Sequence, residues 1–356
     1  RENGLSEAEL TADVKTAHLV VGSSLRRGDM VLTLGAGNVH EVGKALARDL
    51  EVIDKLRREL DDAETVCRLY EPMRRHTTMK VGGPAQYWVE PVSVESFARA
   101  LRFFREAGIP VRVIGRGSNL LVRDGGITGA VIRPGKGEFE DVRVSGGQIT
   151  AGVGARFKKV SNVARANGVA GFEWMEGIPG SVGGGLRMNA GAMGTQTFDQ
   201  VVSVRYLDRD GELHEKPSAE FDVAYRHVGD LIENYAVSAV FAGEEGVDTE
   251  AIAAKIEESA GKRKASQPVA ASSGCIFKNP DEIPAGKLIE ELGLKGAGGG
   301  AARVSDVHGN FIVNEGGATA AEVLELIAQI KARALEERDI ELHTEVQVIG
   351  EAEPGF

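Results

Sequence analysis

Residues 177–194 constrain the fold of this chain more than any other stretch, because seven of these eighteen residues are glycine. Glycine costs backbone entropy in a helix or a strand, so this composition predicts neither element. Closely spaced glycines let the backbone approach a ligand, and their N–H groups can surround an anion such as a pyrophosphate. A flexible linker is the alternative. However, Ile178, Val182, Leu186 and Met188 interleave with the glycines, which indicates a packed segment.

The length of 356 residues predicts two or three domains, and 42% hydrophobic with 27% charged residues is typical of a soluble globular protein. A formal net charge of −11 argues against non-specific nucleic-acid binding but leaves room for a local basic pocket. The two cysteines, Cys67 and Cys275, are too few for a disulfide framework or a cysteine-rich metal site, which favours a reducing cytoplasm. The sequence shows no signal peptide and no apolar run that predicts membrane insertion.

The first fifty residues predict one strand–turn–helix unit, which has too few strands to close a sheet. A helix is expected over 5–21, a buried strand over 29–34, a glycine turn over 35–38 and a helix over 39–60. The segment resembles the tail of the C-terminal domain of Mur ligases of the UDP-N-acetylmuramate–alanine ligase type. The resemblance implies that residues 1–50 are a remnant of such a ligase, without its ATP site, fused to a second protein. Residues 51–65, which are highly charged, are expected to form a linker helix.

The rest of the chain predicts a mixed α+β order without internal repeats. A strand–helix–strand unit is expected over 87–114, and it leads into Gly-Arg-Gly-Ser-Asn at 115–119, which lacks the spacing of the Rossmann fingerprint. Short strands are expected between 127 and 154. The other expected helices are 157–167, 250–264, 287–292 and 319–337, and the other expected strands are 201–207, 236–241, 311–313 and 345–349.

Several separate stretches from residue 74 to residue 350 resemble the UDP-N-acetylenolpyruvoylglucosamine reductases, the MurB family, and they follow one another in the family's order. They are residues 77–83, 115–122, 177–194, 225–226, 274–280, 285–290, 305–314 and 342–350. The resemblance implies an FAD-binding domain of the vanillyl-alcohol-oxidase (PCMH) type over 66–203. It further implies a mixed α/β substrate-binding domain over 204–341 and a C-terminal strand, within 342–356, that returns to the active site.

The resemblance also implies which residues bind FAD. They are Gly115, Gly117, Ser118, Asn119, Leu120, Pro179, Gly180, Ser181, Gly184 and Asn189. The implied activity is the reduction of the enolpyruvyl double bond of UDP-N-acetylglucosamine enolpyruvate to UDP-N-acetylmuramate, for peptidoglycan precursor synthesis. Hydride passes from NADPH to FAD and then to the substrate.

This chemistry requires a group that stabilises charge on the substrate carboxylate and an acid that protonates the neighbouring carbon. Arg226 matches the family's carboxylate-binding arginine, and Glu345, expected in its protonated form, would assist it. Cys275 stands where most of the family has a serine proton donor. A thiol is a stronger acid than an alcohol, so this exchange preserves the role.

Four residues are expected to bind the substrate: Tyr225 and Asn279, with Lys287 and His308 as weaker candidates beside Asn310. Some family members carry a substrate-covering tyrosine loop between the positions of Arg226 and Cys275. Here only 275 − 226 = 49 positions separate them, which predicts that this loop is absent.

Two other functions stay open at this stage. The first is an FAD-dependent oxidase on the same cofactor fold, although the substrate-domain motifs argue against it. The second is a non-catalytic module that tethers or regulates the attached ligase. The expected partners are therefore a UDP-sugar substrate and the ligase half of the same polypeptide, with no nucleic acid.

Overall fold

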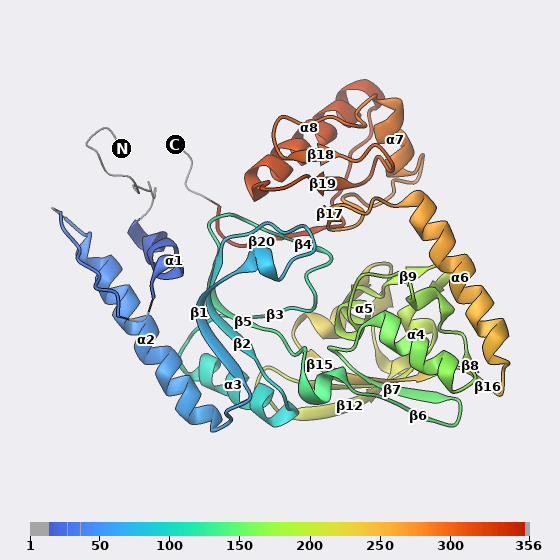
Figure 1. Cartoon of the computed structure of the whole chain (residues 1–356), viewed down its shortest axis with the longest axis horizontal. Coiled ribbons are helices and arrows are strands. Elements are labelled where there is room, and N and C mark those ends of the chain that lie inside the picture. The colour runs from blue at the N-terminus through green and yellow to red at the C-terminus, as the bar shows by residue number, and fades with distance from the viewer. Residues whose placement is uncertain (1–13, 27, 36, 353–356) are drawn as a thin grey trace.

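The computed structural model describes residues 14–26, 28–35 and 37–352 (Figure 1). Its mixed α+β architecture confirms the predicted fold class. The N-terminal part of the helix predicted over 5–21 lies outside the described residues. The helices are α1 (Val14–Ser24), α2 (His40–Leu60), α3 (Val94–Glu106), α4 (Phe157–Ala166), α5 (Val182–Met188), α6 (Thr249–Ser266), α7 (Ala285–Glu291) and α8 (Ala320–Arg338). No helix in these residues combines the length and apolarity needed to cross a membrane.

Helices α1 and α2 pack on the edge of a sheet through the buried carboxylate of Asp49. This side chain accepts hydrogen bonds from Tyr70 Oη (2.7 Å), Tyr87 Oη (2.5 Å) and Gln86 Nε2 (2.9 Å). The second half of α2, predicted as part of a linker, buries apolar side chains, among them Leu56, in the main hydrophobic core. Residues 51–60 are therefore packed against the body of the protein.

The buried strand predicted over 29–34 is wrong, because these residues form no strand and their side chains are exposed. Met30, Leu32 and Leu34 are 90%, 72% and 78% exposed. An apolar strand is stable only when a neighbouring strand satisfies its backbone and covers its face. The part of the chain that the structure describes supplies no such neighbour to this segment.

The first sheet has the strand order β1-β2-β5-β3. Its strands are β1 (Val66–Pro72), β2 (Pro84–Glu90), β5 (Ile127–Ile132) and β3 (Val111–Val113). Helix α3 connects β2 to β3 as predicted, and β5 lies between these two strands, parallel to both. The helix begins with a capping box between Ser93 and Ser96, and it buries Phe97, Leu101 and Phe104.

The second sheet has the order β12-β11-β15-β7-β6 and lies beside α4 and α5 (Figure 1). Its strands are β12 (Leu213–Pro217), β11 (Val201–Leu207), β15 (Tyr235–Ala242), β7 (Gln148–Gly152) and β6 (Val142–Ser145). Strand β15 pairs with β7 from residue 238 to residue 242. The sheet therefore crosses the predicted domain boundary between residues 203 and 204.

Within the glycine-rich stretch, the expectation that no helix forms is wrong. Residues 182–188 form α5, with three glycines in a row inside it. Packing explains this exception, since a Cβ on Gly185 would lie 2.0 Å from Phe157 Cζ and a Cβ on Gly183 would lie 2.9 Å from Val153 Cβ. The close approach of α5 to its neighbours outweighs the low helix propensity of glycine.

A third unit contains the sheet β17-β19-β18, covered by α7 and α8. The carboxylate of Asp124, after β4, accepts hydrogen bonds from the backbone N–H groups of Ala320 and Ala321 and so attaches α8 to the segment that follows β4. The chain then returns as β20, which pairs in parallel with β4 (Figure 1). The remaining strands are β4 (Leu120–Val122), β8 (Val169–Ala170), β9 (Gly191–Ala192), β10 (Thr195–Gln196), β13 (Val223–Ala224), β14 (His227–Val228), β16 (Glu244–Glu245), β17 (Ala271–Ser272), β18 (Ala302–Val304), β19 (Ile312–Asn314) and β20 (Gln347–Ile349).

Candidate active site

The returning C-terminal segment brings two distant parts of the chain to Glu345. The backbone N–H of Glu345 donates to the carbonyl of Ile276 (2.8 Å), next to Cys275. On the other side, Asn119 Nδ2 donates to the carbonyl of Glu345 (3.2 Å), and Gln347 N–H donates to the carbonyl of Asn119 (3.0 Å). A predicted FAD-binding residue and two predicted catalytic residues therefore lie together.

Arg226 reaches the same place from the tip of a hairpin. Strands β13 and β14 pair at Ala224 and His227, so Tyr225 and Arg226 form a two-residue turn. Arg226 has a φ of +57°, which L-residues other than glycine rarely adopt. Its Nε donates to Glu345 Oε1 at 2.7 Å, with side chains that are 21% and 16% exposed. The backbone strain and the ion pair together fix the guanidinium beside Glu345.

Cys275 completes the group of predicted catalytic residues. Burial, assisted by the neighbouring Glu345, raises the pKa of its thiol to about 11, although Arg226 and Arg263 oppose the rise. The thiol therefore holds its proton at neutral pH, as a proton donor must. The same two arginines would stabilise the thiolate that remains after proton transfer. The expectation that Glu345 acts in its protonated form stays a prediction.

Arg263 is a residue of this site that the sequence did not reveal. Basic residues near the end of a helix, such as the run at 262–264 in α6, ordinarily complement the helix dipole from the surface. Lys262 fits that account, since it pairs with Glu258 on the surface. Arg263 instead turns inward, where its side chain lies against Gly177, and burial lowers its pKa. The available signal was its place in α6, shortly before the motif that contains Cys275.

The predicted substrate-binding residues are only partly gathered here. Tyr225 is exposed, and its ring lies 5.0 Å from the guanidinium carbon of Arg226. Asn279 Oδ1 accepts a hydrogen bond from the N–H of Ala285 at the start of α7. Lys287 is exposed on α7, 3.8 Å from Glu291. His308 Nδ1 accepts from the N–H of Asn310, which is a local contact within its own turn.

Asn310, considered above as a substrate ligand, uses its side chain to hold the segment that contains Cys275. Its Oδ1 accepts from the N–H of Phe277, and its Nδ2 donates to the carbonyl of the same residue, both at 2.8 Å. Because both ends of the amide are occupied, Asn310 positions the backbone after Cys275.

The two glycine turns form a cradle that fits a flavin dinucleotide. A Cβ on Gly117 would lie 2.2 Å from the carbonyl oxygen of His76, and a Cβ on Gly115 would lie 2.8 Å from Ser181 Oγ. Ser181 Oγ is buried and has no hydrogen-bond partner among the described residues. By contrast, a Cβ on Gly184 would meet nothing within 4 Å, which leaves open space over α5. An unpartnered hydroxyl and free backbone N–H groups beside open space suit the oxygens of a diphosphate.

The other predicted FAD-binding residues line the same turns. A Cβ on Gly180 would lie 3.5 Å from Ser118 Oγ, so the segments that contain Ser118 and Pro179 lie side by side. Leu120 begins β4, where it pairs with Gln347. The side chain of Asn189 bonds to Gln196 and to the N–H of Phe198, and its φ of +39° ends α5. Asn189 thus shapes the turn after α5.

Several known proteins are similar to this chain over most of its length. The family profile of the UDP-N-acetylenolpyruvoylglucosamine reductase C-terminal domain matches residues 267–349, and that of an FAD binding domain matches residues 85–216. The chain is 41% identical to UDP-N-acetylenolpyruvoylglucosamine reductase of Bacillus velezensis, over 79% of this chain and 93% of that protein. It is 44% identical to the enzyme of the same name from Heliobacterium modesticaldum, over 79% and 90%.

A solved structure is similar as well. The MurB protein of Thermus caldophilus, UDP-N-acetylenolpyruvylglucosamine reductase, superposes with a TM-score of 0.69 at 35% identity, over 80% of this chain and 98% of that chain. The similarity thus extends over nearly the whole length of these relatives. The chain belongs to the UDP-N-acetylenolpyruvoylglucosamine reductase family.

Proposed function

We propose that this chain reduces the enolpyruvyl group of UDP-N-acetylglucosamine enolpyruvate to give UDP-N-acetylmuramate, with FAD and NADPH as cofactors, in peptidoglycan precursor synthesis. The observation that carries the proposal is the convergence of Arg226, Cys275 and Glu345 from three separate segments beside the FAD cradle. An oxidase would not need a carboxylate-binding arginine beside a protonated acid, and a tethering module would need neither.

Each of the three residues has a distinct role. When bound, FAD carries hydride from NADPH to the substrate. Arg226 binds the substrate carboxylate and stabilises the negative charge that builds up there. Glu345 accepts a hydrogen bond from Nε of Arg226 and so holds the guanidinium in place, which leaves the two terminal nitrogens of Arg226 free for the substrate. Cys275 donates its proton to the carbon next to the carboxylate. The S–H bond breaks, a C–H bond forms, and a thiolate remains beside Arg226 and Arg263.

An anaerobic half-reaction tests the proposal. NADPH should bleach the absorbance of the FAD-loaded chain, and the enolpyruvyl UDP-sugar should restore it without oxygen. Bleaching that only air reverses would indicate an oxidase instead. Cys275→Ser should retain turnover with a shifted pH profile. Cys275→Ala should lose turnover while NADPH still reduces the flavin, and an alanine variant with near-normal turnover would remove the acid role.

We also propose that the chain is of the short-loop type. Residues 227–274 contain β14, β15, β16, α6 and β17, joined by short connections, which supports the absence of a tyrosine loop. The test is Tyr235→Phe, which changes the tyrosine of this segment, a largely buried side chain. If the tyrosine loop is absent, this substitution should leave the KM for the UDP-sugar unchanged.

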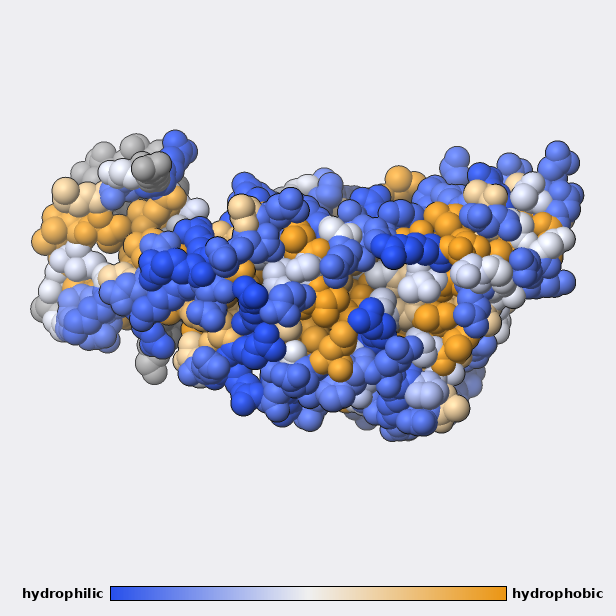
Figure 2. Space-filling model, turned by 90° about the horizontal axis from the view of Figure 1, so that it is seen from below, coloured by the Kyte–Doolittle hydropathy of each residue, from blue (hydrophilic) through white to orange (hydrophobic). Residues whose placement is uncertain are grey.

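We further propose that residues 1–50 are the end of a ligase of the UDP-N-acetylmuramate–alanine type. The exposed apolar segment around Met30, Leu32 and Leu34 supports this, because it resembles a strand that lacks its sheet. Figure 2 shows apolar surface at the end of the molecule that contains the N-terminal helices. We expect the gene to encode, upstream of this chain and in the same reading frame, the nucleotide-binding part of a ligase. A stop codon between the two would contradict the proposal.

We propose a reducing, cytoplasmic location, which the two free cysteines support.

A further inference from the structure

Two arginines meet at the junction of the two glycine turns, and neither was expected to bind the cofactor. Arg116 lies between Gly115 and Gly117 in the first turn. Arg156 precedes α4, and its backbone forms an antiparallel bridge with Ser181 in the second turn. Because Gly115 packs against Ser181 Oγ, the backbone of both arginines lies next to the same buried hydroxyl, while the side chain of Arg116 is partly buried and that of Arg156 is exposed.

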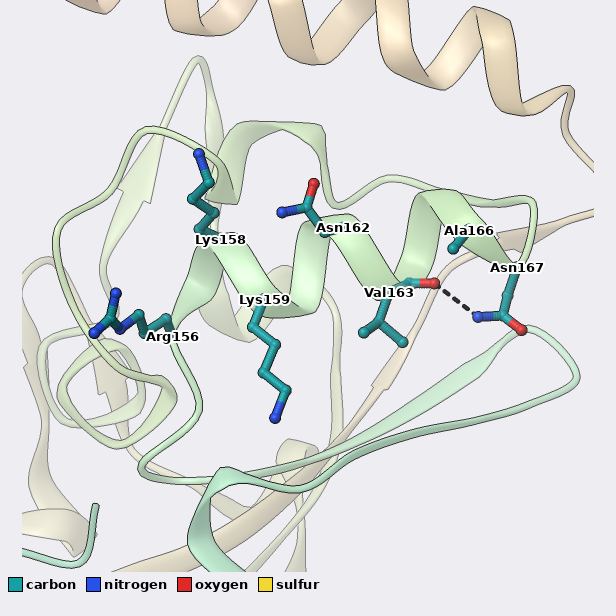
Figure 3. A pocket seen from close by; sticks show the side chains of 7 residues that line it. All are labelled: Arg156, Lys158, Lys159, Asn162, Val163, Ala166 and Asn167. Carbon is teal, nitrogen blue, oxygen red and sulfur yellow. Dashed lines mark hydrogen bonds between the residues drawn. The ribbon is translucent and has the colours of Figure 1, made fainter. Parts of the chain in front are cut away.

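Neither arginine side chain has a hydrogen bond or an ion pair with any described residue, unlike the lysines next to Arg156. Lys158 pairs with Glu176, and Lys159 donates to the carbonyl of Glu140, both at 2.7 Å. These three cations line a groove of about 410 Å³ along α4, in which Arg156 extends from the start of the helix (Figure 3). The two arginines at the glycine turns therefore differ from the lysines beside them, which both have a partner in the protein.

The charges at this junction are unfavourable as they stand. Burial lowers the pKa of Arg116, and the nearby guanidinium groups of Arg156 and Arg133 lower it further, against a smaller opposing effect of Glu140. The first turn of α4 contains no acidic residue, although the N-terminal end of a helix favours negative charge. Ser181 is only 2% exposed, and its Oγ is a buried polar atom without a hydrogen-bond partner among the described residues. Repelling cations beside an unpartnered donor are stabilised by an anion placed between them.

We propose that Arg116 and Arg156 bind the diphosphate of FAD, together with Ser181 Oγ. This inference rests on the proposed function, since it requires FAD in the cradle. A diphosphate ester carries one negative charge on each phosphate, which balances the two guanidinium groups. Arginine suits this role because its planar group offers paired N–H donors to phosphate oxygens. The two arginines would then add cofactor affinity that the glycine turns alone do not provide.

The test measures the affinity of the FAD-free full-length chain for FAD by flavin fluorescence at several salt concentrations. The variants are Arg116→Gln, Arg156→Gln and the double variant, and Lys158→Gln serves as a control with the same change of charge on the same helix. Each single arginine substitution should weaken FAD binding about 10-fold, and the double substitution about 100-fold, because charge-assisted hydrogen bonds are lost. The double variant should also show a weaker dependence of Kd on salt.

Riboflavin, which lacks phosphates, separates this role from a general effect on the fold. The affinity for riboflavin should be the same in the two single arginine variants, the double variant and Lys158→Gln as in the unaltered chain. An FAD dissociation constant of the double variant within threefold of the unaltered chain would overturn the inference, as would an equal loss of riboflavin binding or an equal effect of Lys158→Gln. If the unaltered chain binds no FAD, the proposed function fails instead.

Discussion

The strained turn at Arg226 makes a quantitative prediction that separates its catalytic from its structural contribution. Arg226 has a φ of +57° at the second position of a two-residue turn, where glycine would be favoured. A left-handed conformation costs an L-residue about 1–2 kcal/mol, and glycine loses about 0.5–1 kcal/mol more entropy on folding. Arg226→Gly should therefore be about 1 kcal/mol more stable than Arg226→Ala.

Both variants should nevertheless be less stable than the unaltered chain. Each removes the 2.7 Å hydrogen bond and leaves the largely buried Glu345 without its partner, which costs about 1–3 kcal/mol. Both should lose reduction of the UDP-sugar while keeping FAD, since the role proposed for the guanidinium is to bind the substrate. Urea midpoints of the FAD-loaded proteins give the stabilities, and anaerobic reoxidation by substrate gives the activity.

Ala224→Gly provides the matched control. Ala224 is exposed on β13, next to the turn, and its φ is not positive. Glycine there should destabilise the protein by about 0.5–1 kcal/mol, so the effect of glycine reverses its sign over two positions. Equal stabilities of Arg226→Gly and Arg226→Ala, or a less stable glycine variant, would refute the argument that this turn is strained.

Three further predictions concern the cradle, the N-terminal helices and the thiol. Gly184→Ala should stabilise the FAD-free chain by about 0.5–1 kcal/mol, because alanine is favoured in a helix, yet it should weaken FAD binding, because the new Cβ occupies open space in the cradle. Gly185→Ala should instead destabilise the chain by about 1–3 kcal/mol, because its Cβ clashes with the core. Calorimetry of the FAD-free proteins distinguishes the two. Asp49→Ala should cost about 3–5 kcal/mol, since it leaves buried hydroxyl groups unpaired, and Asp54→Ala, on the exposed face of the same helix, should change the unfolding midpoint little. The pKa of the Cys275 thiol rises from 9.0 to about 11 on folding, so its contribution to stability is complete below pH 9 and is lost as the pH rises through 11. At pH 8 its alkylation, followed by mass spectrometry of its peptide, should be about 100-fold slower in the folded than in the unfolded chain, and equal rates would contradict the burial of the thiol.

Helices with local signals could be predicted from the sequence. Ser93 and Thr319 each begin a capping box, and the apolar side chains that follow, such as Phe97 and Val323, recur at helical spacing. These signals lie within a few residues of each other and do not depend on the rest of the fold. The motif residues of the site could be named for a different reason, since Arg226, Cys275 and Glu345 each lie in a stretch that resembles the family.

The features that could not be predicted depend on partners far away in the sequence. The strand expected at 29–34 needs a sheet that the described residues do not supply. Helix α5 forms despite its glycines because Phe157, more than twenty positions earlier, leaves no room for a side chain at Gly185. Arg263 belongs to an apparently solvent-exposed basic run, and only the packing of α6 turns it toward Gly177 and Cys275. Local propensity is a weak guide wherever such tertiary contacts decide.

The backbone pairing of the C-terminal segment explains why the acid and the cofactor cradle keep a fixed distance. Glu345 donates to the carbonyl of Ile276, one residue after Cys275, while Gln347 donates to the carbonyl of Asn119 in the cradle. Glu345, which contacts the residue after the proposed proton donor, and Gln347, which contacts the proposed flavin-binding turn, are thus only two positions apart. Since Asn310, in the turn before β19, holds Phe277, the segment that contains Cys275 is bound both by this turn and by the returning chain. Hydride and proton must reach adjacent carbons of one substrate, and this short connection holds their two sources in one rigid frame.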